Sequence, residues 1–89
     1  MNKLSLYYYE SCPFCKIALN AITSYGVDVE LRDVEKNSKH YADLNRGGGH
    51  SQVPCLLVER IGGQKEWLYE PSQIVQLLRL RSILLLKVA

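Results

Sequence analysis

Two cysteines at the junction of a strand and a helix constrain this chain more than any other feature. The tetrapeptide Cys12-Pro13-Phe14-Cys15 directly follows an apolar run at residues 4–9 and directly precedes a helical pattern. Free N–H groups and the helix dipole stabilise negative charge at a helix N-terminus, so Cys12 as the N-cap favours a reactive thiolate. Pro13 suits the first helical position, where its missing N–H is not needed. Cys15 lies one turn further, within disulfide reach of Cys12, and this order predicts a dithiol–disulfide site.

Length and composition indicate one small globular domain spanning residues 1–89, which we expect to be a monomer. The 89 residues are 47% hydrophobic and 22% charged, and the net charge is +2. Acidic and basic residues are mixed along the chain without a basic run, which argues against nucleic-acid binding. The longest aliphatic run, at residues 83–86, is too short to span a membrane. Three cysteines without a secretory signal argue against a disulfide framework and predict a cytoplasmic protein.

Periodicity and turn signals predict seven elements in the order β-α-β-α-β-β-α. The helix between the first two strands makes them parallel with a right-handed crossover, whereas a Gly62-Gly63 turn joins the last two as an antiparallel hairpin. The chain is therefore of the α/β class, with a four-stranded mixed sheet and three helices distributed over both of its faces. The strands are expected at residues 3–9, 27–32, 55–58 and 66–69, and the helices at 13–25, 38–45 and from residue 71.

The ends and exposure of these elements carry further expectations. Gly26 is expected to end the first helix, and the glycines at 47–49 are expected to end the second. The alternating strand at 27–32 is expected to be half exposed and near a sheet edge. The segment 83–88 either extends the third helix or forms a separate piece. The second helix has its expected apolar positions at Tyr41, Ala42 and Leu44.

Individual side chains in the strands are assigned to faces by the same alternation. We expect Tyr8 to lie in the core, with Tyr7 and Tyr9 sharing the other face of the first strand and Tyr9 lining the thiol cleft. Cys55 is interpreted as a small buried residue at the start of a core strand rather than as a third redox thiol.

Four motifs together resemble the glutaredoxin family, in its order and spacing over nearly the whole chain. They are Cys12-Pro13-Phe14-Cys15, Val53-Pro54, Gly62-Gly63 and Tyr69-Glu70-Pro71-Ser72. The resemblance implies a thioredoxin-like fold and glutathione-dependent reduction of disulfides. It also implies that the backbone of Val53 binds glutathione and that Pro54 follows a cis peptide bond.

The chain departs from the family pattern at two positions. Tyr9 stands where many members have a lysine, and Pro71 stands where members with a Tyr-Glu-Ser motif use serine to hold the γ-glutamyl end of glutathione. Because proline has no N–H, we expect Ser72 to take that role, with Glu70 accepting from the γ-glutamyl ammonium; the alternative is that this segment only caps the helix. The glutathione-binding residues expected in this groove are Tyr9, Pro13, Phe14, Gln52, Val53, Pro54, Glu70 and Ser72.

The chemistry expected of such a site is thiol–disulfide exchange. Cys12 attacks a protein disulfide or a glutathione mixed disulfide, Cys15 resolves the enzyme-bound intermediate, and glutathione regenerates the dithiol. The expected partners are therefore glutathione and disulfide-containing proteins. No metal is expected, because only Cys55, His40 and His50 remain to complete a zinc site, at unlike spacings.

Two other functions remain open at this stage. One is a module that binds glutathione or an iron–sulfur cluster without turnover. The other is a redoxin of the same chemistry that is reduced by thioredoxin reductase instead of glutathione.

Overall fold

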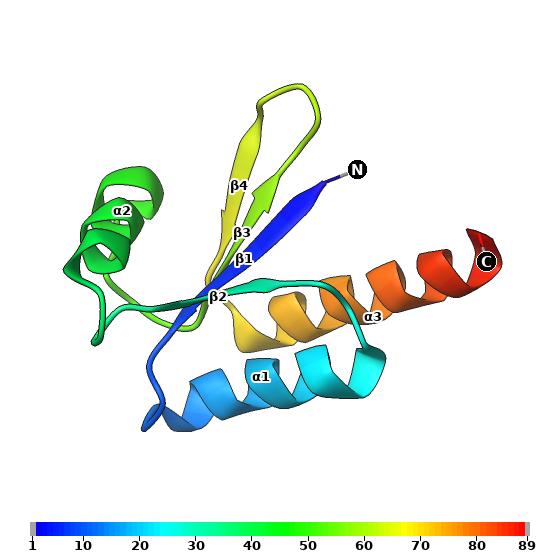
Figure 1. Ribbon diagram of the computed structural model, residues 1–89, viewed down its shortest axis with the longest axis horizontal. Helices are drawn as coiled ribbons and strands as arrows, with labels where there is room; N and C mark the ends of the chain where they lie inside the picture. The colour runs from blue at the N-terminus through cyan, green and yellow to red at the C-terminus, as the bar shows by residue number, and fades with distance from the viewer. Residues whose placement is uncertain (1, 89) are drawn as a thin grey trace.

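A four-stranded mixed sheet forms the centre of the molecule, with strand order β2-β1-β3-β4. The computed structural model describes residues 2–88, with the side chains of residues 2–84 (Figure 1). The element order is β-α-β-α-β-β-α, as expected. The bounds are β1 Lys3–Tyr8, α1 Pro13–Tyr25, β2 Glu30–Asp33, α2 Ser38–Gly48, β3 Cys55–Glu59, β4 Lys65–Leu68 and α3 Pro71–Val88.

The strand directions follow from how the strands are connected. β1 and β2 are joined through α1 and run parallel, with Leu6 opposite Leu31. β3 runs antiparallel to both of its neighbours, β1 and β4. The β3–β4 hairpin closes through the Gly63 N–H, which donates to the Arg60 carbonyl oxygen at 2.9 Å. This pairing makes β1 and β3 the two central strands, so both of their faces are covered.

One face of the sheet packs against α1 and α3, which lie side by side beneath it (Figure 1). Alternate residues of the central strands, Leu6 of β1 and Leu56 of β3 among them, point to this face. They meet Ala18 from α1 and the fully buried Ile74 and Leu78 from α3. Burial of this apolar surface is the main stabilising contribution that holds the two helices on the sheet.

The other face of the sheet packs against α2 and has its own cluster of buried side chains. Tyr7, Cys55 and Leu57 point to this face and meet Leu44 of α2. Tyr7 is fully buried, and Tyr8 only packs partly against the first cluster. Tyr7 and Tyr8 thus lie on opposite faces, as expected, but Tyr8 is only partly buried whereas Tyr7 is fully buried. Alternation along a central strand separates the two faces but does not indicate which face is more deeply buried.

A charged side chain closes the outer edge of this second cluster. The Arg32 guanidinium of β2 donates from Nη1 to the Tyr7 hydroxyl at 2.5 Å, and its Cζ lies 5.3 Å from the centre of the Tyr7 ring. Arg32 also pairs with Glu30. The Tyr7 hydroxyl, buried beneath α2, thus has a charged hydrogen-bond partner.

Helix α1 begins and ends where the sequence predicts, because both of its caps are local. Gly26 has φ of 64°, a left-handed conformation, and its N–H donates to the Ile22 carbonyl oxygen. The second strand differs from the expectation, since it covers residues 30–33 instead of 27–32. It does lie at a sheet edge. Val27 is buried although it lies outside the strand, and its burial explains the longer alternating pattern.

Helix α2 is longer than expected and runs through two of the glycines predicted to end it. A Cβ on Gly47 would lie 2.2 Å from Cζ2 of Trp67, so this glycine allows the indole ring to touch the helix backbone. The helix ends at Gly48, and the third of these glycines, Gly49, is its C-cap. The apolar positions were also only partly correct, because Leu44 is buried whereas Tyr41 is 47% exposed.

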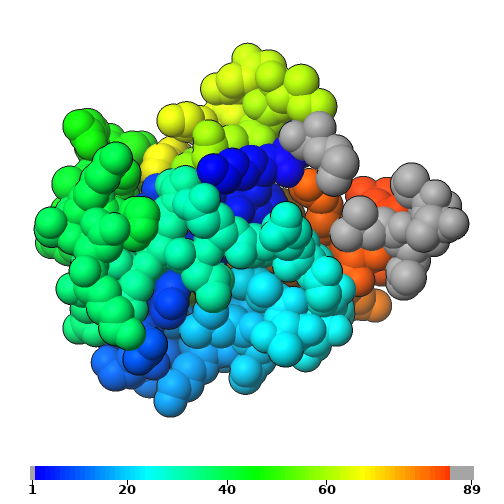
Figure 2. All heavy atoms as spheres, viewed as in Figure 1, coloured from blue at the N-terminus to red at the C-terminus, as the bar shows by residue number. Residues whose placement is uncertain are grey.

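Helix α3 continues to Val88, which decides between the two alternatives for residues 83–88 in favour of extension. The side chains of residues 85–88 lie outside the described residues. In the space-filling view the β3–β4 hairpin projects from the body formed by α1, α2 and β2 (Figure 2). Within the described part of the chain, no helix is long and apolar enough to cross a membrane.

Candidate functional site

Cys12 lies at the N-cap of α1, between the end of β1 and the first helical turn. Its backbone is extended, with φ of −81° and ψ of 116°, and its Sγ accepts a hydrogen bond from the Cys15 backbone N–H at 3.2 Å. Pro13 occupies the start of the helix, as expected. The sulfur therefore faces the unpaired N–H groups of the first turn, where a thiolate is stabilised.

Both cysteines of this pair are buried, and all three cysteines of the chain are free thiols. Cys12 is 4% exposed and Cys15 is fully buried. The first cysteine of the motif is therefore nearly as buried as the second. The Cys12 N–H donates to the Tyr9 carbonyl oxygen at 3.2 Å and closes the turn before α1.

The second cysteine resists ionisation. Burial, the largest cause, raises the pKa of Cys15 to about 12 together with a smaller contribution from Cys12. The Tyr9 backbone lowers the pKa in part without cancelling the rise. Cys15 is consequently a neutral thiol near pH 7.

Tyr9 lies directly beside the thiol pair, at the position where many relatives in the resembled family have lysine. The charge of Cys12 is the largest of the influences that raise the pKa of the Tyr9 hydroxyl, ahead of burial. A neutral hydroxyl therefore lies beside the sulfur here instead of an ammonium group.

A groove of about 170 Å³ opens next to the start of α1. It brings together the first turn of α1, the segment before β3, and the junction of β4 with α3. The Val53–Pro54 peptide bond in its wall is cis, as the family resemblance implied. The lining residues are Phe14, Gln52, Val53, Pro54, Tyr69, Glu70 and Pro71.

Most of the residues predicted to bind glutathione meet at this groove, but three do not line it. Of the described residues with that assignment, Tyr9, Pro13 and Ser72 lie outside the groove wall. Ser72 is exposed in the first turn of α3. That helix begins with the Ile74 N–H donating to the Glu70 carbonyl oxygen at 3.0 Å. Glu70 is exposed and lines the groove.

Tyr69 and Pro71 line the groove although the sequence analysis assigned them no such place. Tyr69 follows the last residue of β4, and its hydroxyl donates to the His50 carbonyl oxygen at 3.2 Å. The two rings meet edge to face, 5.4 Å apart. The Tyr69-Glu70-Pro71-Ser72 motif pointed to this place, but the prediction took only Glu70 and Ser72 from it as binding residues.

The remaining candidates occupy separate places. Cys55 is fully buried, and burial raises the pKa of its thiol to about 12, which agrees with its assignment as a small core residue. His40 lies edge-on to Tyr7, whereas His50 lies against Tyr69. Among the described residues, no group of three or more histidine, cysteine or acidic side chains is placed to hold a metal ion.

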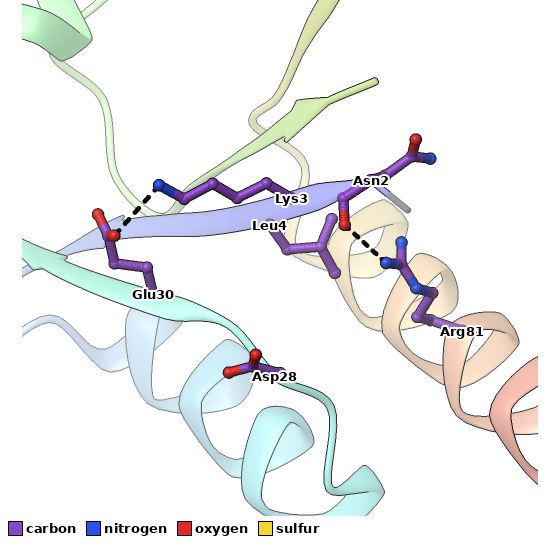
Figure 3. A pocket seen from close by; sticks show the side chains of 6 residues that line it. All are labelled: Asn2, Lys3, Leu4, Asp28, Glu30 and Arg81. Carbon is purple, nitrogen blue, oxygen red and sulfur yellow. Dashed lines mark hydrogen bonds and ion pairs between the residues drawn. The ribbon is translucent and has the colours of Figure 1, made fainter. Parts of the chain in front are cut away.

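A larger hollow of about 290 Å³ lies at the opposite end of β1 from the thiols (Figure 3). Lys3 and Glu30 form an ion pair of 3.3 Å across it. Arg81 donates to the Asn2 carbonyl oxygen at 2.7 Å, which ties α3 to the start of β1. The charged groups of Lys3, Glu30 and Arg81 are thus paired within the hollow. Because the hollow also lies at the far end of β1, we assign it no part in the chemistry of the cysteines.

Comparison with known proteins agrees with this geometry. The family model described as Glutaredoxin matches residues 4–63. The chain belongs to the glutaredoxin family. An archaeal glutaredoxin from Archaeoglobus fulgidus is 24% identical, with a TM-score of 0.64 over 89% of this chain and 88% of that one. A thioredoxin-like protein is 23% identical, with a TM-score of 0.66 over 84% of this chain and 99% of that one. The fold of this glutaredoxin-family chain is thus thioredoxin-like.

A further similar structure is a glutathione-related enzyme. The maleylacetoacetate isomerase from Anaeromyxobacter dehalogenans 2CP-1, solved with dicarboxyethyl glutathione and citrate in its active site, is 25% identical with a TM-score of 0.68. The match covers 91% of this chain but only 37% of the isomerase chain. The chain therefore shares its fold with only about a third of the isomerase. No curated protein sequence matches the chain.

Proposed function

We propose that this protein is a glutathione-dependent thiol–disulfide oxidoreductase that reduces protein disulfides and glutathione mixed disulfides. The observation that carries the proposal is the position of Cys12 Sγ, which accepts the Cys15 N–H at the N-terminus of α1. The groove of seven residues beside it gives an extended substrate a place to lie. We further propose that residues 1–89 form one domain, that the protein acts as a monomer and that it is located in the cytoplasm.

In the first reaction the Cys12 thiolate attacks a protein–glutathione mixed disulfide at the glutathione sulfur. The disulfide bond between the protein sulfur and the glutathione sulfur breaks, the protein leaves as a thiolate, and a Cys12–glutathione disulfide forms. The thiolate of a second glutathione then attacks the sulfur of the bound glutathione. Oxidised glutathione leaves and the Cys12 thiolate is restored, so the cycle needs no other cysteine.

In the second reaction the substrate is a disulfide within or between proteins. Cys12 forms a mixed disulfide with one substrate sulfur and releases the other as a thiolate. Cys15 loses its proton, attacks Cys12 Sγ and releases the second substrate thiolate, which leaves a Cys12–Cys15 disulfide. Once Cys12 is in a disulfide its charge no longer raises the pKa of Cys15, although burial still does. Two glutathione molecules then reduce the internal disulfide.

Glutathione is proposed to lie along the groove with its sulfur toward Cys12. The backbone of Val53 is proposed to pair with the cysteinyl backbone, and Glu70 to accept from the γ-glutamyl ammonium. Val53 and Glu70 both line the groove, which supports this orientation. Ser72 in the first turn of α3 is proposed to donate to the γ-glutamyl carboxylate from beyond the groove wall, where the N-terminus of α3 favours an anion.

The test is a turnover assay on a glutathionylated peptide with three single substitutions. Cys12→Ser is expected to abolish turnover, whereas Cys15→Ser keeps it on the mixed disulfide and loses most of it on a protein disulfide. Cys55→Ser is the matched control, because it also removes a fully buried thiol but not one of the pair. Turnover that survives Cys12→Ser would contradict the proposal.

The same assay identifies the reductant. The wild-type protein is supplied either with glutathione and glutathione reductase or with thioredoxin reductase, each with NADPH. Glutathione is expected to support turnover of the mixed disulfide. Turnover with thioredoxin reductase alone would replace glutathione as the electron donor and leave the roles of the two cysteines in place.

A further inference from the structure

The segment between α2 and β3 forms a large part of the groove wall. It carries three consecutive lining residues, Gln52, Val53 and Pro54. Residues 50–54 belong to no helix or strand, and β3 begins at Cys55. Among the described residues, no backbone–backbone hydrogen bond outside the helices and strands involves residues 50–54. Contacts made by side chains therefore help to fix the position of Val53.

The Tyr69 side chain makes these contacts at the beginning of the segment. Its hydroxyl donates to the His50 carbonyl oxygen at 3.2 Å. Its ring meets the His50 imidazole edge to face at 5.4 Å and an interplanar angle of 84°. Both contacts hold the residue at which the chain leaves α2.

The same hydroxyl reaches the residue that follows the segment. The Tyr69 hydroxyl lowers the pKa of the Cys55 thiol against the larger effect of burial, so it lies close to the first residue of β3. The Tyr69 side chain also packs against the buried cluster that contains Cys55. Cys55 is itself fixed, because it is fully buried and pairs with Tyr7 across the sheet. One side chain thus lies against both ends of the segment that holds Val53.

A glycine in α2 gives the hydroxyl room to reach this position. A Cβ on Gly48 would lie 1.9 Å from the Tyr69 hydroxyl oxygen and 3.0 Å from Cζ. Gly48 is within the helix, where alanine would otherwise be the more stable residue. The close approach of the Tyr69 hydroxyl therefore explains why glycine occupies this helical position.

We infer that Tyr69 is a positioning residue, whose hydroxyl pins residues 50–55 so that the Val53 backbone stays at the groove beside Cys12. The inference rests on the proposed function, since it concerns binding of the glutathione portion of the substrate. Gly48 contributes to the same positioning, because any larger residue there would displace the Tyr69 hydroxyl.

The first test compares Tyr69→Phe with Tyr7→Phe, which is a matched control. Each removes one hydroxyl from the same side of the sheet, but the Tyr7 hydroxyl accepts from Arg32 and not from the groove segment. Tyr69→Phe is expected to raise KM for a glutathionylated peptide about three- to tenfold, the loss expected for one hydrogen bond. The rate of Cys12 alkylation should stay unchanged. Tyr7→Phe should leave KM unchanged.

A second readout needs no glutathione and separates this inference from the proposed function. Amide hydrogen exchange at residues 51–53 is expected to be faster in Tyr69→Phe than in either the wild type or Tyr7→Phe. If the wild type fails to turn over while exchange responds in this way, the proposed function is wrong and the positioning role holds. Unchanged exchange in Tyr69→Phe overturns the inference whatever the activity.

Gly48→Ala tests the device from the other side. It leaves the tyrosine intact and is expected to reproduce the higher KM and the faster exchange. Adding Gly48→Ala to Tyr69→Phe should produce less than the sum of the two effects, because both act through the same hydroxyl. Fully additive effects would show that the two residues act independently and would overturn the shared mechanism.

Discussion

The order in which the three thiols react with an alkylating agent follows from the raised pKa of two of them and from the position of Cys12 at the N-terminus of α1. Burial raises the pKa of both Cys15 and Cys55 to about 12. Near pH 7 their thiolate fractions are then about 10⁻⁵, which is roughly three thousand times below that of a free cysteine of pKa about 8.5. We expect iodoacetamide to modify Cys12 alone in the native protein at pH 7.

The pH dependence sharpens this prediction. Labelling of Cys15 and Cys55 should rise about tenfold per pH unit from pH 7 upward, since only the thiolate reacts and its fraction grows in that proportion below the pKa. Peptide mass spectrometry after timed quenching gives the three rates separately. Labelling in urea is the control, because unfolding removes the burial and should bring all three rates close together.

Substitution of the partner cysteine separates the two causes of the high pKa of Cys15. Cys12→Ser removes the charge of Cys12, which raises that pKa, but leaves burial, the largest cause. Cys15 should therefore remain slow in this variant. If native Cys15 is labelled as fast as Cys12 at pH 7, or becomes as reactive as a free cysteine in Cys12→Ser, the reasoning from burial fails and the two roles would have to be exchanged.

Three further predictions concern the stability of the fold. Alanine in a helix interior usually stabilises relative to glycine, but overpacking against Trp67 should make Gly47→Ala lower the free energy of unfolding by about 1–3 kcal/mol. Thermal unfolding should show a lower Tm, and a raised Tm would contradict the contact. The pKa of Cys55 is higher in the folded than in the unfolded chain, so its contribution to stability is complete below about pH 8.5 and is lost as the pH rises toward 12. The loss is up to about 1.4 kcal/mol per pH unit. In urea titrations from pH 8 to 10, the free energy of unfolding should therefore decline less steeply for Cys55→Ala than for the wild type. Tyr7→Phe should lower the free energy of unfolding by about 1–3 kcal/mol, because the Arg32 guanidinium loses its acceptor; an unchanged urea midpoint would count against that bond.

Local signals in the sequence were enough to determine α1 and the thiol at its N-terminus. An N-cap cysteine, a proline at the first helical position and a glycine at the end act on their own turns, so the helix covers residues 13–25 as predicted. The β-α-β-α-β-β-α order and the hairpin also follow from short-range patterns. Five of the eight predicted glutathione-binding residues meet in the groove because they lie in motifs at the ends of these elements.

Contacts between distant segments decided the rest. Helix α2 continues through Gly47 because Trp67, twenty residues further along the chain, needs the space that a side chain would fill. Tyr7 rather than Tyr8 is fully buried because α2 and Arg32 cover its face of a central strand. The Tyr69 hydroxyl reaches the groove segment only after β4 pairs with β3. Sequence patterns report the preference of each segment, whereas burial and close approach depend on which other segments fold against it.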